Sequence, residues 1–187
     1  MARKKEYIEE VVLEKAMNLF WKNGYEKTSM QMLEEEMGIN KFSIYSTFGS
    51  KHNLFLESLR CYKSKIDVIF EKFKSGSHGA HDIKQFFYDS VSPDYKNIDQ
   101  KGCLLTSTYN EFAEIEDLLI KEQMVSFMDN LKVLFVEKLR TNTAKDEKTI
   151  LQEANFLLLA KHGLAAASRV NTKNEIEDYI EMTFKNI

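Results

Sequence analysis

The stretch from Thr28 to Lys51, TSMQMLEEEMGINKFSIYSTFGSK, constrains the fold of this chain more than any other stretch. It holds two short helical patterns separated by a tight break at Gly38, Ile39 and Asn40. Gly38 stands where the end of a helix often needs a left-handed residue, and Asn40 is a good N-cap for the helix that follows. The stretch therefore predicts a helix-turn-helix, a unit common in helical proteins and in DNA-binding domains.

The first helix of this pair has its own start signal and one apolar face. We expect Thr28 to cap it, with Gln31 three residues later completing a capping box. Met30, Leu33 and Met37 recur at spacings of three and four residues and so form one stripe. The three acidic residues 34–36 are expected to face away from the second helix.

The second helix, Lys41 to Phe48, combines two inward apolar residues with a polar outer face. Ile44 and Phe48, four residues apart, are expected to face the core. The outward set can donate hydrogen bonds to phosphates and base edges and includes one exposed aromatic: Lys41, Phe42, Ser43, Tyr45, Ser46 and Thr47. An isolated helix of about two turns is marginal, so its presence favours a supporting neighbour and an outer face that meets a groove. The alternative is an ordinary helical hairpin in an all-α core.

The segment GINKFSIYSTFGSKHNLF resembles the second half of the DNA-binding domain of the tetracycline-repressor (TetR) family of bacterial transcriptional regulators. The matching features are Gly38-Ile39, Lys41, Ser43, Tyr45, Phe48, Gly49-Ser50-Lys51 and Leu54-Phe55. Upstream, Ala16-Met17-Asn18-Leu19-Phe20 and Gly24-Tyr25-Glu26-Lys27-Thr28-Ser29 also match the family pattern. The resemblance covers roughly residues 8 to 60, and the segment Gly102 to Thr106 resembles the start of the sixth helix in some members.

The resemblance implies an all-α protein of about nine helices in two domains. Residues 1–49 would form a three-helix, helix-turn-helix DNA-binding domain. Residues 50–187 would form a helical effector-binding and dimerisation domain, with helix 50–73 as the connector. In the family the last two long helices pair with their copies in a homodimer, and a small apolar or aromatic effector releases a palindromic operator in double-stranded DNA. The two recognition helices would then occupy successive major grooves about 34–36 Å apart.

The resemblance also assigns DNA contacts residue by residue. Thr28, Tyr45 and Lys51 would hold phosphates, with Ser29 beside them. Five residues would lie near base edges: Lys41, Phe42, Ser43, Ser46 and Thr47. Phe42 departs from the small residue usual after the lysine, so the base preference of relatives does not carry over, and we expect Phe42 to contact a thymine methyl group.

Helical periodicity continues along the rest of the chain. We expect helices over 7–23, 51–73, 82–90, 102–113 and 114–139, one opened by Asp146 or Thr149, and a last one opened by a capping box of Thr172 and Glu175. In the first helix the expected core stripe is Ile8, Val11, Val12, Ala16, Leu19 and Phe20. The break around residues 75–81 and the stretch 92–101 are expected to be loops.

Composition excludes several classes of protein. With 43% hydrophobic and 29% charged residues, seven Gly and one Pro, the chain is of ordinary globular type and favours helices. It has no run of 18 or more apolar residues and no signal-peptide pattern, so we expect a cytoplasmic protein without a membrane span. It lacks a Gly-rich phosphate loop, an H-E-x-x-H motif and a nucleophile elbow, so we expect no enzyme, cofactor or metal site.

Charge alone does not indicate a nucleic-acid partner. Residues 1–51 hold eight Lys or Arg and eight Asp or Glu, whereas a DNA-binding domain usually has a basic excess. The basic tail 3–5, Lys27, Lys41 and Lys51 nevertheless bracket the second helix of the pair. A helical ligand-binding or scaffold protein without DNA binding therefore stays open as an alternative.

Candidate effector contacts combine apolar walls with a few polar groups on the central helices: Tyr62, Phe86, Tyr109, Asn110, Phe127, Met128, Phe156 and His162. His162 lies among Leu and Ala and is either a satisfied core histidine or a ligand contact. The two cysteines, Cys61 and Cys103, leave open a thiol-based redox-sensing regulator. Cys103 follows Gly102 near a predicted helix N-terminus, a setting that favours the thiolate form.

Overall fold

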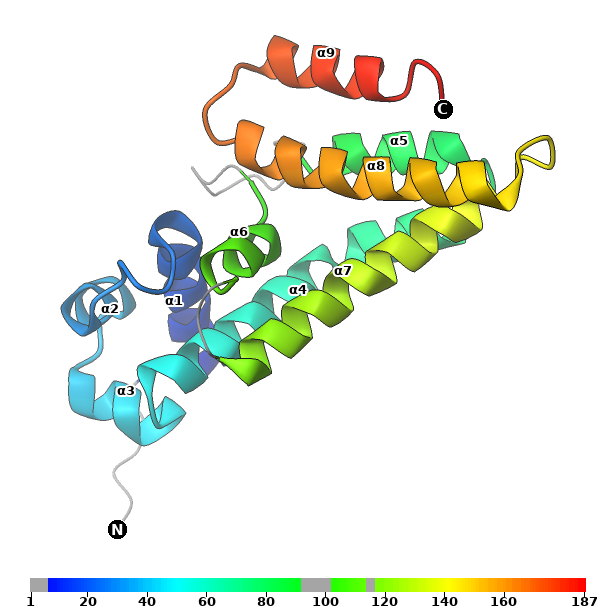
Figure 1. The fold of residues 1–187 in the computed structure, drawn as a ribbon. Helices are drawn as coiled ribbons and strands as arrows, with labels where there is room; N and C mark the ends of the chain where they lie inside the picture. Colours follow the sequence, from blue (N-terminus) through cyan, green and yellow to red (C-terminus); the bar gives the residue numbers. More distant parts are fainter. Residues whose placement is uncertain (1–6, 92–101, 114–116) are drawn as a thin grey trace. The chain divides into compact units, whose positions relative to one another are not determined.

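The computed structural model describes residues 7–91, 102–113 and 117–187, which form nine α-helices and no strand (Figure 1). The helices are α1 (Glu9–Asn23), α2 (Met30–Met37), α3 (Lys41–Phe48), α4 (Lys51–Ser75), α5 (Ala80–Asp89), α6 (Leu104–Glu111), α7 (Leu118–Leu139), α8 (Glu147–Ala167) and α9 (Lys173–Thr183). The all-α prediction is confirmed. The predicted basic arm at 3–5 and the loop 92–101 lie outside the described residues.

Contacts divide the chain into two compact units, Met1–Lys65 and Ile66–Ile187. The division falls within α4, so this one continuous helix contributes its first part to unit 1 and its last part to unit 2. None of the helices in the described ranges has the length and apolar character that crossing a membrane requires.

In unit 1, α1 buries a face one residue away from the predicted stripe. Ile8 and Val11 are 66% and 49% exposed, whereas Met17 and Trp21 are buried. The stripe was misplaced because the pattern has apolar residues on both sides of Val12, and only contact with neighbouring helices selects between them. Trp21 packs edge-on against Tyr62 of α4, with ring centroids 4.9 Å apart.

The start of α2 differs from the prediction by one residue. Ser29 is the N-cap, and its side chain accepts a hydrogen bond from the backbone N–H of Met32 at 3.2 Å. Thr28 is fully buried instead, and its hydroxyl donates to the carbonyl of Gly24 at 2.6 Å. The predicted capping box of Thr28 and Gln31 is therefore wrong. At the other end Gly38 has φ +71°, as the turn was expected to require.

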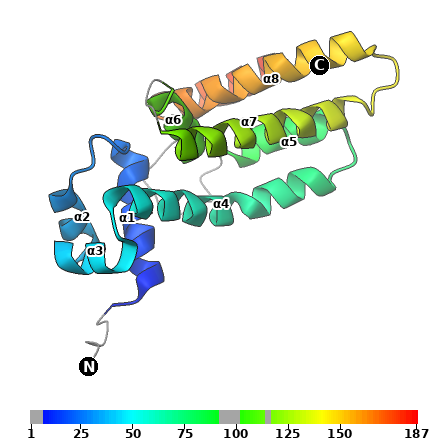
Figure 2. The same cartoon turned by 60° about the horizontal axis from the view of Figure 1, so that its bottom comes forward.

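Unit 2 is built on an aromatic core shared by α4, α5 and α7. Phe73, Phe86, Phe87 and Phe135 are all buried and lie in ring contact with one another. Figure 2 shows α7 lying between α8 and the part of α4 that belongs to this unit. α6 packs against α7 and α8.

Lys138 of α7 fastens the turn between α4 and α5. Its ammonium is buried, donates to the carbonyls of Lys74 (3.0 Å) and Gly76, and lies 3.5 Å from the Asp82 carboxylate. These carbonyls close the C-terminal end of α4, where backbone acceptors have no partner within the helix. The segment expected to be a flexible linker is thus a fixed turn.

The helices α8 and α9 begin and cross at defined residues. Asp146 caps α8, and Thr172 with Glu175 forms the predicted capping box of α9. The Tyr179 hydroxyl donates to the carbonyl of Ala160 at 2.9 Å, and a β-carbon at Gly163 would lie 3.1 Å from that hydroxyl oxygen. A glycine therefore lets α9 approach α8 closely at this point.

Candidate nucleic-acid interface

The two faces of α3 are separated as the sequence predicted. Ile44 and Phe48 are buried, whereas Lys41, Phe42 and Tyr45 are exposed. Phe42 is 82% exposed, which is unusual for a phenylalanine in the absence of a partner. The outer face of α3 therefore offers a cation, two aromatic rings and the exposed Ser46.

The N-terminus of α3 is held by two side chains. Asn40 accepts from the backbone N–H of Ser43 at 2.8 Å, which confirms the predicted cap. Glu34 of α2 accepts from the backbone N–H of Lys41. The prediction that all of residues 34–36 face away is therefore wrong for Glu34. Its carboxylate compensates the positive end of the α3 dipole and joins α2 to α3.

Three of the predicted DNA contacts have partners or burial inside unit 1. The Thr47 hydroxyl lies 2.5 Å from the hydroxyl of Tyr7, so Thr47 faces the start of α1 and is half-buried. Ser43 is also half-buried, and the buried side chain of Thr28 is turned to Gly24. Their outward positions were expected from helical spacing, which does not register the tyrosine that precedes α1.

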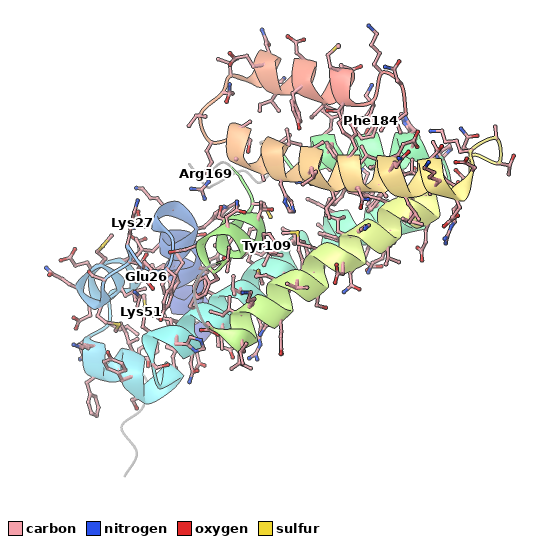
Figure 3. The ribbon with its side chains drawn as sticks, viewed as in Figure 1. Glu26, Lys27, Lys51, Tyr109, Arg169 and Phe184 are labelled. Atoms are coloured by element: carbon pink, nitrogen blue, oxygen red, sulfur yellow. The ribbon has the colours of Figure 1, made fainter. Side chains whose placement is uncertain are left out.

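Lys51 is the first residue of α4. Ser50 caps this helix by accepting from the backbone N–H of Asn53 at 3.0 Å, and the ammonium of Lys51 lies 4.3 Å from the centroid of the Tyr25 ring. Figure 3 shows Lys51 near Lys27 and Glu26 of the loop between α1 and α2. A helix N-terminus with a nearby lysine is favourable for a phosphate.

In unit 2 the structure brings three of the predicted effector residues together. Nε2 of His162 lies 3.1 Å from the sulfur of Met128, and the rings of His162 and Tyr109 are 5.6 Å apart. Burial, and after it the charge of Lys161, lowers the pKa of His162, so the fold favours the neutral ring. Beside them, Phe70 is in ring contact with Phe86 and with Phe127.

The other predicted effector residues lie elsewhere. Tyr62 belongs to the core of unit 1, Asn110 is exposed, and Phe156 is 50% exposed on α8. An open hollow of about 390 Å³ on α7 contains none of the predicted residues; it is lined by Leu118, Lys121, Glu122, Val125, Ser126, Asp129 and Asn130. Across the described ranges, no three His, Cys, Asp or Glu side chains gather as a metal site.

Sequence reasoning missed Lys161. It is 5% exposed, and burial lowers its pKa, whereas the charge of Cys103 acts in the opposite direction. Its ammonium lies 5.7 Å from the centroid of the Phe86 ring. The available signal was its position within LLLAKHGLAAA, where a lysine interrupts an apolar helix.

The two cysteines are free thiols in different settings. Burial, followed by the charges of Lys65 and Glu14, determines the pKa of the Cys61 thiol, and the net result is a rise. Cys103 occupies the N-cap position of α6.

Comparison with known proteins identifies the helix-turn-helix. Residues 12–58 match the family model described as bacterial regulatory proteins, tetR family. An uncharacterized HTH-type transcriptional regulator of Bacillus subtilis, YezE, is 33% identical over 93 residues, which are 49% of this chain and 48% of that protein. This match therefore spans about half the length of that relative. The negative transcriptional regulator of the biofilm operon icaADBC of Staphylococcus aureus, IcaR, is 21% identical over 93% of this chain and 97% of its own.

Solved structures share the fold along almost the whole chain. The TetR family regulator CifR, as a cysteine mutant complexed with a 26-base-pair operator DNA, has a TM-score of 0.80 at 21% identity and covers 99% of both chains. The reduced form of Escherichia coli NemR has a TM-score of 0.71 at 18% identity, over 93% of this chain and 94% of its own. Together with the match over the helix-turn-helix, these likenesses show that the chain belongs to the TetR family of bacterial transcriptional regulators.

Proposed function

We propose that this protein is a transcriptional repressor that binds a palindromic operator in double-stranded DNA as a homodimer. The observation that carries the proposal is the outer face of α3, where Lys41, Phe42 and Tyr45 are exposed while the inner face is sealed. In a helix-turn-helix this outer face enters the major groove. There a lysine can bond to guanine, and an apolar ring can contact a thymine methyl group.

The relatives support this function. IcaR is named as a negative regulator of an operon, and CifR was solved on operator DNA. These relatives are regulators and not enzymes, and we assign no catalytic residue and no cofactor. A bacterial repressor acts in the cytoplasm, where the DNA lies.

The homodimer is supported by an exposed apolar stripe on α8. Phe156, Leu159, Gly163, Ala166 and Val170 follow one another at spacings of three and four, and all are exposed. Leu159 and Val170 are 70% and 84% exposed. A second copy of the same stripe would cover these side chains and place two α3 helices on one DNA duplex. Phe156 is therefore assigned to the dimer interface instead of the effector site.

We further propose that a small apolar or aromatic effector binds beside Tyr109, Phe127, Met128 and His162. The thioether and rings supply a polarisable wall, and the neutral imidazole offers one polar contact. An effector that binds preferentially to a dimer with a different spacing of its α3 helices would release the operator by population shift.

The test is a salt titration of DNA binding by fluorescence anisotropy. The probes are a random duplex and DNA from upstream of the protein's own coding region. We expect tighter binding to the upstream DNA, with log K falling linearly with log salt. No binding to either duplex at low salt would contradict the proposal and favour the ligand-binding or scaffold alternative, which the balanced charge of residues 1–51 keeps open.

A pair of matched variants separates base reading from general loss. Phe42→Ala is expected to change the preference among operator variants at one base position. Val133→Ala removes a comparably apolar exposed side chain on α7, 53% exposed, and should change nothing. An equal loss of affinity for every sequence in Phe42→Ala would contradict the assignment of Phe42 as a base contact.

A further inference from the structure

Cys103 lies where α6 begins against α8. Its neighbour Gly102 has φ +96°, and a β-carbon there would lie 2.7 Å from the carbonyl oxygen of Ala165. Further along the same two helices, the rings of Tyr109 and His162 are in contact at 5.6 Å. Thus the start of α6 is pressed onto the α8 turn that contains Ala165, and Figure 3 shows Arg169 of the same helix end close by.

Lys161 lies one helical turn before Ala165 and so on the same side of α8. It is 5% exposed, and within the described ranges no hydrogen bond or ion pair of its ammonium is recorded. A buried ammonium is unfavourable unless an anion compensates it. The thiolate of Cys103 is the anionic group that acts on it, since its charge raises the Lys161 pKa against the effect of burial.

We propose that Cys103 and Lys161 form a thiolate–ammonium pair that is a modification site for electrophilic small molecules of the α,β-unsaturated carbonyl class. A helix N-terminus and a neighbouring lysine are the two features that make a cysteine nucleophilic, and both meet at Cys103. The second thiol, Cys61, has neither feature, because it lies within α4 and burial raises its pKa.

The reaction is a conjugate addition. The Cys103 sulfur attacks the β-carbon, a sulfur–carbon bond forms, and the carbon–carbon π electrons move onto the carbonyl as an enolate. Lys161 supplies the proton that the enolate needs, which leaves a neutral amine and a neutral thioether adduct. A lysine whose pKa is lowered by burial is suited to release that proton.

The consequence for regulation rests on the proposed function. The contact between Gly102 and Ala165 has no room for one added carbon, so an adduct at the adjacent Cys103 would separate α6 from α8. Because α8 also carries the exposed apolar stripe, the adduct is expected to change the dimer and to weaken operator binding.

Reactivity is tested first, on the full-length protein without DNA. Iodoacetamide alkylation is followed by peptide mass spectrometry at pH 7, and Cys61 serves as the internal reference. We expect Cys103 to react at least about 10-fold faster than Cys61. Equal or slower reaction of Cys103 would overturn the proposal.

Variants of Lys161 identify the source of that reactivity. Lys161→Met keeps the length and removes the charge, and it should slow Cys103 without changing Cys61. Lys161→Arg keeps the charge and should preserve fast reaction. Circular dichroism confirms that each variant is folded, and the Arg variant keeps the test decisive if the Met variant is not. Unchanged Cys103 rates in folded Lys161→Met would overturn the pairing.

DNA release is tested second, with crotonaldehyde as the electrophile. Wild-type protein should lose operator affinity as the Cys103 adduct forms, whereas Cys103→Ser should retain it. An adduct that leaves operator binding unchanged would overturn the regulatory part. If unmodified protein binds no DNA, the proposed function fails, but the alkylation rates still decide whether the reactive pair exists.

Discussion

Replacement of Leu159 by aspartate tests the dimer at the centre of the α8 stripe. Leu159 is 70% exposed in the protomer, so an acidic side chain there is hydrated and the protomer should fold as before. In the dimer the same position would be covered by the partner. The variant therefore affects association while leaving the fold intact.

The magnitude follows from exposure and symmetry. Full burial of a leucine side chain contributes about 1.5–3 kcal/mol, so the exposed part of Leu159 offers about 1–2 kcal/mol in each protomer. Two copies contribute about 2–4 kcal/mol, which corresponds to a dimer Kd raised about 30- to 1,000-fold. Two carboxylates brought together without partners would add several kcal/mol more, at about 3–5 kcal/mol for an uncompensated buried charge.

Analytical ultracentrifugation measures this effect, with thermal unfolding as the check on folding. Val133→Asp on α7, at 53% exposure, introduces the same charge outside the stripe and should remain dimeric. We expect Leu159→Asp to sediment as a folded monomer and to lose operator binding. A Leu159→Asp dimer as stable as wild type, or dissociation by Val133→Asp alone, would refute the assignment of the interface to α8.

Three further predictions concern single side chains. Lys51→Ala should weaken binding to all DNA sequences and reduce the salt slope of the dimer by about 1.8, about 0.9 for each phosphate released, whereas Lys185→Ala, with the same charge change, should not. Ser29→Ala removes the hydroxyl that accepts from the N–H of Met32 and should cost about 1 kcal/mol in urea unfolding; no change would show that Ser29 is not the cap. Because burial lowers the pKa of His162, the unfolded state binds the proton first, so the stability that neutral His162 allows is present above about pH 6.5 and is lost as the pH falls below it; His162→Gln should show a weaker loss on acidification in thermal unfolding, and an identical profile would contradict this.

The helix-turn-helix was predictable because its signals are local. Gly38 and Asn40 act on their own helix ends, and Ile44 and Phe48 follow one spacing rule. The same reasoning failed at Thr28, because two adjacent hydroxyl residues can each cap a helix and only the loop conformation makes Ser29 the cap.

The properties that depend on neighbouring helices were not predictable. Phe156 looks like a pocket residue in the sequence, yet its side of α8 faces outward. Glu34 looks like part of an exposed acidic run, yet it bonds across a turn to Lys41. Lys161 was overlooked because helical lysines are usually solvated, and only the packing of α6 on α8 buries it.

The close approach at Gly102 has a consequence for bacterial genetics. Its backbone conformation strains any other residue, and a β-carbon there would collide with the Ala165 carbonyl. A single missense mutation at this codon would thus force the start of α6 away from α8 permanently, without any chemical signal. A screen for colonies that express the regulated genes constitutively should recover Gly102 alleles whose protein is folded, abundant and unresponsive.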